Sequence, residues 1–374
     1  MLNVEADMID TKACEWLIEN GGVTTRYRVY RELLQVESEA KKIENELLEN
    51  DGVKKWLKLL KPETPPQHRS MAHGSFDFCL ENALPKLTQL GLHAGFAQVR
   101  EAVGFYFEHI KESIKNQTEM NLLSRDGLYG FFLILVVDFL VDAGFKDDFL
   151  FDYMLKSLDE MYGFIRQKSY DIYISDEERS KLTGVPKNWV NRKFIKKEIL
   201  DNHGFCYPLI YDIMGMHKLY DYKNPEIDNK VDEIISYVSN DDFHNKIDDG
   251  YGILIAGPKR YNSMGWDPKY PGWFNIRECI ESGGASRVLF SAQTYSKYPI
   301  AVKTRWFNEL LEYLEAYKTE NDTYRFPSEW IKESSAYAVG GNHLSFGENR
   351  TKKNWSEIES TLYMQFLKQK CSIM

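Results

Sequence analysis

The chain has 374 residues, of which 43% are hydrophobic, 28% charged and 14% aromatic. This much apolar material offsets the entropy lost on folding, which excludes a disordered, collagen-like or simple coiled-coil protein. The 56 acidic residues outnumber the 47 basic ones and give a net charge of −9. Binding to nucleic acid is therefore disfavoured, because a phosphate backbone requires a basic face.

The N-terminal residues and the cysteines bear on the cellular compartment. Residues 1–10 are acidic and lack the basic region that opens a signal peptide. The five cysteines are odd in number and lack the spacing of a disulfide framework, which is typical of reduced thiols. The most apolar run, residues 128–141, is too short to span a bilayer and contains Asp138, so it predicts a buried helix. We therefore expect a cytoplasmic protein without a transmembrane segment.

Four segments, taken in chain order, show the spacing of amphipathic helices. Apolar residues recur at offsets of 0, 4, 7, 8 and 11 from Val99, Ile227 and Trp306, and at 0, 4, 8 and 11 from Leu150. This period places them on one side of a helix, where they form a single buried stripe. No comparable run of strict alternation occurs, so the sequence predicts an all-α fold with few strands.

Three stretches interrupt the helical pattern, and we expect them to be insertion loops: 62–75, 162–202 and 257–275. The first and third each hold three prolines. The second holds a cluster of basic residues, which consists of Lys187, Arg192, Lys193, Lys196 and Lys197. Long ordered loops on a helical scaffold often cover the opening of its functional site. The alternative is that these loops are insertions without a role in function.

Short turns recur between the predicted helices. A turn of the type Asp-Gly-x-aromatic, with His in place of Asp in one copy, occurs at residues 126–130, 203–207 and 249–252. Gly91 and Gly144 stand where a glycine commonly ends a helix in the left-handed conformation. Helices and turns that recur in a fixed order indicate a repeat architecture. In such a fold each helix pair needs its neighbours to bury its apolar face.

Helix pairs joined by such turns resemble the repeats of squalene/hopene cyclases and of protein prenyltransferase β-subunits. The segments 26–34 and 347–350 also resemble an uncharacterised bacterial branch of that superfamily, and the resemblance covers residues 11–367. It implies an α/α toroid, a ring of helical hairpins formed by a single domain of residues 1–374. It further implies that a hydrophobic small molecule is bound in an aromatic-lined central cavity.

The reaction motifs of that superfamily are incomplete in this chain. Class II cyclases protonate an alkene with an Asp-x-Asp-Asp cluster, but the aspartate pairs at 147–148, 241–242 and 248–249 lack its first aspartate. The prenyltransferase zinc set, Asp-x-Cys with a distant histidine, begins at residues 77–79 without that histidine at the expected distance. We therefore predict no cofactor and no complete metal site, and the sequence leaves open whether the protein is an enzyme.

His73 is the first candidate for a catalytic residue, because histidine titrates near neutral pH and serves as a general acid or base. Asp77 follows four residues later and is expected to orient its ring. One alternative is a metal site that adds His68 and Cys79 to these two residues. The other is an ordinary His–Asp hydrogen bond that only fixes the ring tautomer.

Further candidate catalytic residues stand at the turns and near the C-terminus. Asp126, His203 and Asp249 lie at repeat turns, which in a toroid line one rim of the cavity. The alternative is that they stabilise tight turns, as Asp before Gly commonly does. In the glycine-rich segment 340–350, Glu348 is a candidate base, and the alternative is a closing loop.

The candidate ligand-binding residues are aromatic or belong to the segment 340–350. The aromatic residues at the turns and on the third loop are expected to line the cavity: Tyr129, Tyr207, Tyr251, Trp266 and Trp273. Arg350 and the neighbouring backbone amides would hold an anion, and His343 belongs to the same pocket wall.

These observations leave three hypotheses for function. The first is a terpenoid cyclase-like or prenyltransferase-like protein that binds or transforms a hydrophobic small molecule, with aromatic faces that stabilise cations. The second is a carbohydrate-active lyase or hydrolase, because sugars also stack on aromatic rings and their cleavage needs paired acidic groups. The third is a non-catalytic helical-repeat scaffold whose concave face binds a protein or peptide.

Overall fold

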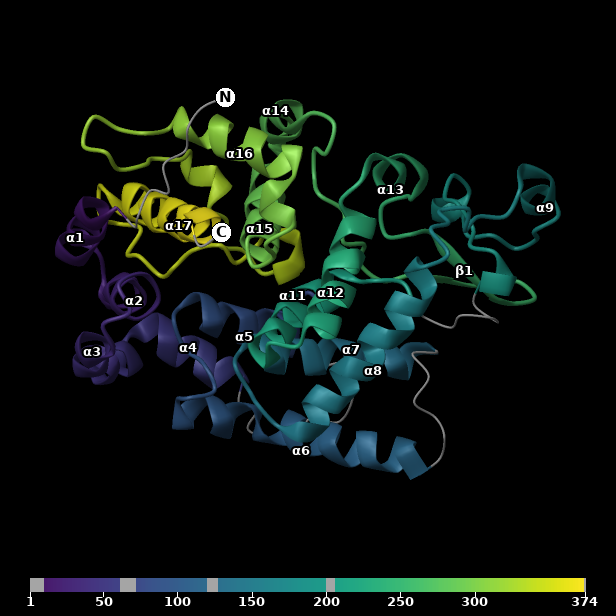
Figure 1. Cartoon of the computed structure of the whole chain (residues 1–374), viewed down its shortest axis with the longest axis horizontal. Coiled ribbons are helices and arrows are strands. Elements are labelled where there is room, and N and C mark those ends of the chain that lie inside the picture. Colours follow the sequence, from purple (N-terminus) through teal and green to yellow (C-terminus); the bar gives the residue numbers. More distant parts are fainter. Residues whose placement is uncertain (1–9, 61–71, 120–126, 200–205, 373–374) are drawn as a thin grey trace. The chain divides into compact units, whose positions relative to one another are not determined.

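The computed structural model describes residues 10–60, 72–119, 127–199 and 206–372 (Figure 1). Most of these residues lie in helices, and their strands form one small antiparallel hairpin, which confirms the predicted mostly helical fold. Within these ranges no helix combines the length and the apolar character that crossing a membrane requires. The chain contains two compact units, which we describe separately.

Unit 1 comprises Met1–Glu108, Ala143–Phe145 and Pro271–Met374. Its N-terminal helices are α1 (Thr11–Asn20), α2 (Val23–Arg28), α3 (Glu37–Glu49), α4 (Asp51–Leu60), α5 (Leu80–Gln89) and the first half of α6 (Ala97–Glu119). Its C-terminal helices are α14 (Ile276–Cys279), α15 (Ala285–Tyr295), α16 (Arg305–Glu315) and α17 (Trp355–Ser372). Because α1 and α2 pack against α17, the two ends of the chain share one core.

Unit 2 comprises His109–Asp142 and Lys146–Tyr270. Its helices are α7 (Gly127–Asp142), α8 (Asp148–Ile165), α9 (Asp176–Ser180), α11 (Ile210–Met216), α12 (Pro225–Val238) and α13 (Asp241–Lys246), and its strands are β1 (Ile253–Gly257) and β2 (Arg260–Ser263). Helix α7 packs on α8 and α11, and α8 packs on α12. Gly215 lets α11 approach α7 closely, since a Cβ at this position would lie 2.9 Å from Cα of Asp138.

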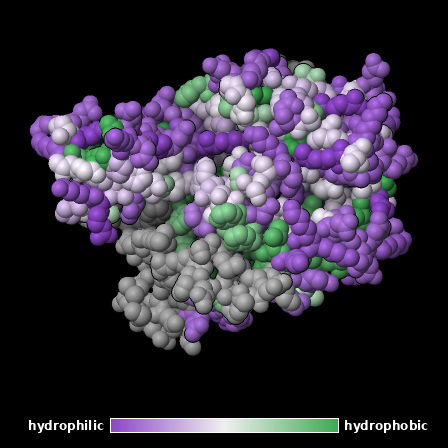
Figure 2. Space-filling view, turned by 180° about the vertical axis from the view of Figure 1, so that it is seen from behind, coloured by the Kyte–Doolittle hydropathy of each residue, from purple (hydrophilic) through white to green (hydrophobic). Residues whose placement is uncertain are grey.

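The predicted apolar stripes are buried in both units. Every residue of the stripes in α8 and α12 is buried. The stripes in α6 and α16 are buried apart from Phe107, Tyr313 and Tyr317, which are half-buried. On the face shown in Figure 2, hydrophilic residues predominate, as expected when most large apolar side chains are buried inside the units.

The predicted loops contain more local structure than the sequence indicated. Residues 62–71 of the first loop lie outside the described residues. In the second loop, α8 continues to Ile165 and α9 follows. Isolated backbone bridges pair Tyr173 with Ile195 and Phe194 with Ile253. In the third, the described hairpin of β1 and β2 reaches Ser263.

The first helices and the C-terminal segment around Glu348 meet in the core of unit 1. Oε1 of Glu348 accepts hydrogen bonds from the amide of Gly22 at 2.7 Å and from Oγ1 of Thr25 at 2.6 Å, which caps the N-terminus of α2. The guanidinium of Arg28 lies 4.2 Å from the ring centre of Phe366 in α17. Glu348, predicted as a base, thus has a structural role in joining the first helices to the C-terminal segment.

The predicted left-handed glycines are present at the ends of α5 and α7. Gly91 has φ +96° and Gly144 has φ +90°. After Gly91, the amide of Leu92 donates to the carbonyl oxygen of Leu87 at 2.9 Å, which satisfies an acceptor at the end of α5. A Cβ at Gly91 would lie 2.9 Å from Cδ1 of Tyr27, so both the backbone conformation and the space require glycine.

We predict that Gly91→Ala lowers the free energy of unfolding by about 1–2 kcal/mol, because alanine is strained at positive φ and its Cβ meets the Tyr27 ring. The matched control is Gly104→Ala inside α6, where the added Cβ meets nothing within 4 Å and improves helix propensity. Urea denaturation of both variants is the measurement. Equal stability of the two variants would contradict the assigned role of Gly91.

Candidate functional site

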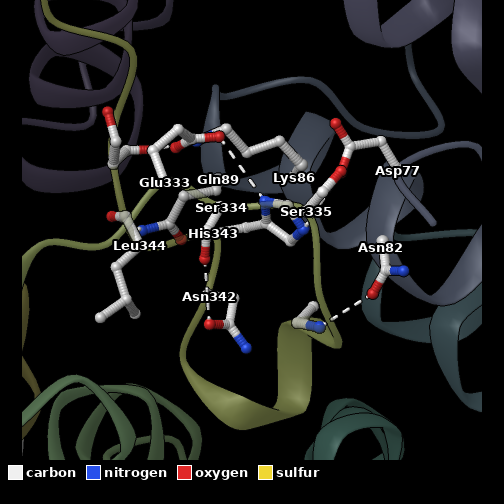
Figure 3. A network of polar contacts seen from close by, with 12 residues as sticks. Asp77, Asn82, Lys86, Gln89, Glu333, Ser334, Ser335, Asn342, His343 and Leu344 are labelled. Carbon is white, nitrogen blue, oxygen red and sulfur yellow. Dashed lines mark hydrogen bonds and ion pairs between the residues drawn. The ribbon is translucent and has the colours of Figure 1, made fainter. Parts of the chain in front are cut away.

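The candidate site lies in unit 1, where the turn of residues 72–79 leads into α5 (Figure 3). Two buried side chains at the start of α5 hold this turn. Nδ2 of Asn82 donates to the carbonyl oxygens of Gly74 and Phe76, each at 2.8 Å, and its Oδ1 accepts from the amide of Ala338 at 2.8 Å. The carboxylate of Glu81 accepts from the amide of Gly74. These bonds fix the path of the turn.

His73, on this turn, is paired with a carboxylate that the sequence prediction did not name. Its Nδ1 lies 2.8 Å from Oε1 of Glu81, whereas Oδ1 of the predicted partner, Asp77, accepts from Oγ of Ser335 at 2.6 Å. A proton on Nδ1 would face this carboxylate, which only accepts, and Nε2 would then be the basic nitrogen of the ring. The side chain of His73 is 36% exposed and that of Glu81 is 1% exposed, so a buried anchor orients a ring that reaches solvent.

The segment 332–344 brings a second histidine to the site. An antiparallel bridge pairs Glu333 with His343. Nε2 of His343 donates to the carbonyl oxygen of Ala336 at 3.0 Å and lies 3.9 Å from Oδ1 of Asp77. Its Nδ1 lies 3.5 Å from Oε1 of Glu333. The imidazole of His343 therefore lies between two carboxylates (Figure 3).

A buried lysine anchors this segment to α5. Nζ of Lys86 lies 2.5 Å from Oε2 of Glu333 and donates to the carbonyl oxygen of Ser345 at 2.6 Å. Burial lowers the pKa of Lys86 from its usual value, and the charge of Glu333 opposes that change. Burial also opposes ionisation of Glu333, but His343 and Lys86 outweigh it and hold the pKa of this carboxyl below its usual value. We call His73, Asp77, Glu81, Glu333 and His343 the His73 site.

A buried carboxyl of α17 lies behind Lys86. Oε1 of Glu359 accepts from Oγ of Ser345 at 2.6 Å and from the amide of Glu348 at 3.0 Å. Its Oε2 is buried and has no hydrogen-bond partner among the residues that the structure describes. Burial raises the pKa of Glu359 to about 7, although these hydrogen bonds and the charge of Lys86 favour the ionised form.

Two other predicted residues of unit 1 make structural contacts away from the His73 site. The guanidinium of Arg350 donates to the carbonyl oxygen of Ile331 at 2.5 Å and lies 4.6 Å from the ring centre of Trp355. Trp273 is buried, and its carbonyl oxygen accepts from Arg305 at 3.3 Å. Of the predicted residues, the structure therefore brings Asp77 and His343 close together, and His73 lies on the same turn as Asp77.

Three predicted aromatic residues belong to unit 2. Tyr207 and Tyr251 are buried with ring centres 5.2 Å apart, and the hydroxyl of Tyr251 donates to the carbonyl oxygen of Pro208 at 2.7 Å. Trp266 is half-buried, and its carbonyl oxygen accepts from the amide of Ile210 at 3.3 Å. These contacts place the two tyrosines in the core of unit 2, where they pack against neighbouring side chains.

The remaining predicted residues lie at turns. Asp249 is 68% exposed, and its Oδ1 lies 3.1 Å from Nζ of Lys269. This exposed ion pair fits the alternative that Asp249 stabilises a turn. Asp126 and His203 lie outside the described residues, and so does the side chain of Tyr129, whose backbone belongs to α7.

Sequence reasoning missed Glu81, Lys86 and Glu333. A signal for Lys86 was present, because Asn82, Lys86 and Gln89 recur at offsets of 0, 4 and 7 and thus share one face of α5. Polar residues at this spacing predict a buried polar face when the helix packs inside a unit. Glu333 has no such signal, because its contact with Lys86 spans 247 residues.

The alternative of a metal site receives no support from the described side chains. His68 lies outside them, and no group of three or more His, Cys, Asp or Glu residues within the described ranges is arranged to hold a metal ion. Burial raises the pKa of the Cys79 thiol to about 11, which opposes formation of the thiolate that zinc binds.

No family model matches this chain, and no curated protein or solved structure matches it either. The resemblance to the cyclase and prenyltransferase superfamily therefore stays a prediction. Inference about function depends on the contacts, burial and charges within unit 1.

We predict that the raised pKa of Glu359 makes stability fall as the pH rises. The carboxyl loses its proton near pH 4.5 in the unfolded chain but only near pH 7 in the folded one, so stability is lost between these values. The loss is on the order of 3 kcal/mol. Glu359→Gln keeps the acceptor oxygen and cannot ionise, so its stability should change less over this range.

Urea denaturation at pH 4.5, 6 and 8 measures this difference. Glu312→Gln is the control, because Glu312 is exposed on α16. If the wild type and Glu359→Gln show the same pH dependence, the carboxyl of Glu359 is not the titrating group.

Proposed function

We propose that unit 1 carries an acid–base catalytic site for a sugar-like small molecule, with His73 as the residue that transfers the proton. The observation that supports this proposal most directly is the contact between His73 Nδ1 and the buried carboxylate of Glu81 at 2.8 Å. In this proposal the carboxylate of Glu81 faces a proton on Nδ1, and Nε2 is available to take a proton from a substrate or to return one.

The second histidine would complete the chemistry of the site. His343 lies between Asp77 and Glu333, so a positive charge on its ring would meet a carboxylate on either side. Asp77 is 23% exposed and Glu333 is 31% exposed, which leaves both carboxylates within reach of a polar substrate. Cleavage of a glycosidic bond needs an acid and a base, and in this proposal these are His73 and the carboxylate of Asp77.

An exposed aromatic pair beside these residues favours a sugar as the substrate. Phe76 and Phe78, on the same turn as His73, are 60% and 40% exposed, and their rings are stacked with centres 5.2 Å apart. The ring of Tyr337 lies 5.6 Å from that of His73. Aromatic faces beside polar groups suit a sugar ring, which has apolar faces and polar edges.

The terpenoid-type function predicted from the resemblance stays a prediction, as does the α/α toroid. The acid that such a function requires would have to be a protonated carboxyl open to an apolar cavity. Glu359, whose pKa burial raises to about 7, is the candidate for such an acid, but it is fully buried. The exposed polar groups of the His73 site support the carbohydrate hypothesis more than the terpenoid one.

The test is a panel of 4-nitrophenyl glycosides for hydrolysis and of uronate-containing oligosaccharides for β-elimination. We expect the wild-type protein to turn over at least one member of the panel. His73→Gln should lower kcat about 100- to 10,000-fold, since it removes the general acid or base. Glu81→Gln should also lower kcat, because the amide no longer selects the tautomer of the ring.

His109→Gln is the matched control, because His109 is exposed on α6 and lies outside the site. Circular dichroism of each variant verifies that the fold is retained. Turnover that His73→Gln leaves at the wild-type rate would refute the role of His73. Failure of the wild type to bind or convert any sugar of the panel would refute the substrate class.

A further inference from the structure

A cavity of about 540 Å³ opens on unit 2, beside the turn after α8 and the end of α13. Its walls come from three segments that are far apart in the sequence, residues 168–173, Lys193 and residues 245–246. The lining residues are Lys168, Ser169, Tyr170, Asp171, Tyr173, Lys193, Asn245 and Lys246. Lys193 belongs to the basic cluster of the insertion 162–202, which the sequence analysis singled out.

The charge of the cavity is opposite to that of the chain. Three lysines and one aspartate line it, whereas the whole chain has a net charge of −9. Lys193 lies 3.0 Å from Asp248, and Lys246 lies 3.1 Å from Asp242. Lys168 has no carboxylate at ion-pair distance among the described residues, so its charge is available to a ligand. Its backbone is held in the left-handed conformation, with φ +50°.

The side chains of Tyr170 and Tyr173 are held in place, because their hydroxyls make hydrogen bonds within the protein. The hydroxyl of Tyr170 donates to the carbonyl oxygen of Tyr237 at 3.2 Å and accepts from Nδ2 of Asn240 at 2.6 Å. The hydroxyl of Tyr173 donates to the carbonyl oxygen of Tyr251 at 2.6 Å. What each tyrosine offers to the cavity is therefore its ring. The ammonium groups of Lys193 and Lys246 lie over these rings, with Nζ 4.8 Å from the ring centre of Tyr173 and 5.8 Å from that of Tyr170, so a ligand would meet rings and charges side by side.

We propose that this cavity binds a phosphate monoester of a small organic molecule. Several lysine ammonium groups around one opening suit the two negative charges of a phosphate, which lysine binds as a point charge. The tyrosine rings suit the organic part, which would lie against them while the phosphate meets Lys168 and its neighbours. The site belongs wholly to unit 2, so it is independent of the function proposed for the His73 site.

Isothermal titration calorimetry of the full chain with phenyl phosphate and with inorganic phosphate tests the proposal. We expect both probes to bind saturably and phenyl phosphate to bind more tightly, because only its ring can use the tyrosine walls. Added salt should weaken both, since Lys168 and Lys246 are exposed and Lys193 is half-buried. Lys168→Gln should weaken phenyl phosphate about tenfold, as expected for the loss of one charge-assisted hydrogen bond.

Lys187→Gln is the matched control, because it removes one positive charge from an exposed lysine of the same insertion, outside the cavity. It should leave the affinity unchanged. Equal effects of the two substitutions, or no saturable binding by the wild type, would overturn the site. Equal affinities for phenyl phosphate and inorganic phosphate would overturn the assignment of an organic ester.

Discussion

The arrangement of the His73 site depends on the buried ion pair between Lys86 and Glu333. Lys86 is 3% exposed, and a buried ammonium group costs several kcal/mol unless it is paired and hydrogen-bonded. The carboxylate of Glu333 and the carbonyl oxygen of Ser345 meet this requirement. The ion pair thereby holds the segment 332–344 against α5, which brings His343 close to Asp77.

Two other polar residues of α5, the buried Asn82 and the half-buried Gln89, also bind the C-terminal segment. Asn82 bonds to the turn that precedes the helix and to the amide of Ala338, while Gln89 donates to the carbonyl oxygen of Leu344 at 3.0 Å. Each of these polar groups would be costly to bury alone, so each one fixes where its partner lies. The polar side chains of α5 therefore determine where the C-terminal segment packs.

The sequence predicted the features that depend on local patterns. The apolar stripes of α8 and α12 and the left-handed glycines at 91 and 144 are present, because helix periodicity and glycine conformation are properties of short segments. The sequence also indicates His73, Asp77 and His343 as candidate site residues, and their function stays a prediction. What the sequence did not predict is which residues pair, since Glu81 rather than Asp77 holds His73. Glu348 likewise serves α2, through a contact across 326 residues that no local pattern contains.

The central claim is that Glu81 orients His73 as the proton-transferring group, and the tautomer of His73 tests it most directly. The measurement is the ¹⁵N chemical shifts of the imidazole nitrogens of His73, in selectively labelled wild type and Glu81→Gln, at a pH where the ring is neutral. The account predicts that the proton is on Nδ1 in the wild type and that this preference is lost in Glu81→Gln. A proton on Nε2 in both proteins would contradict it.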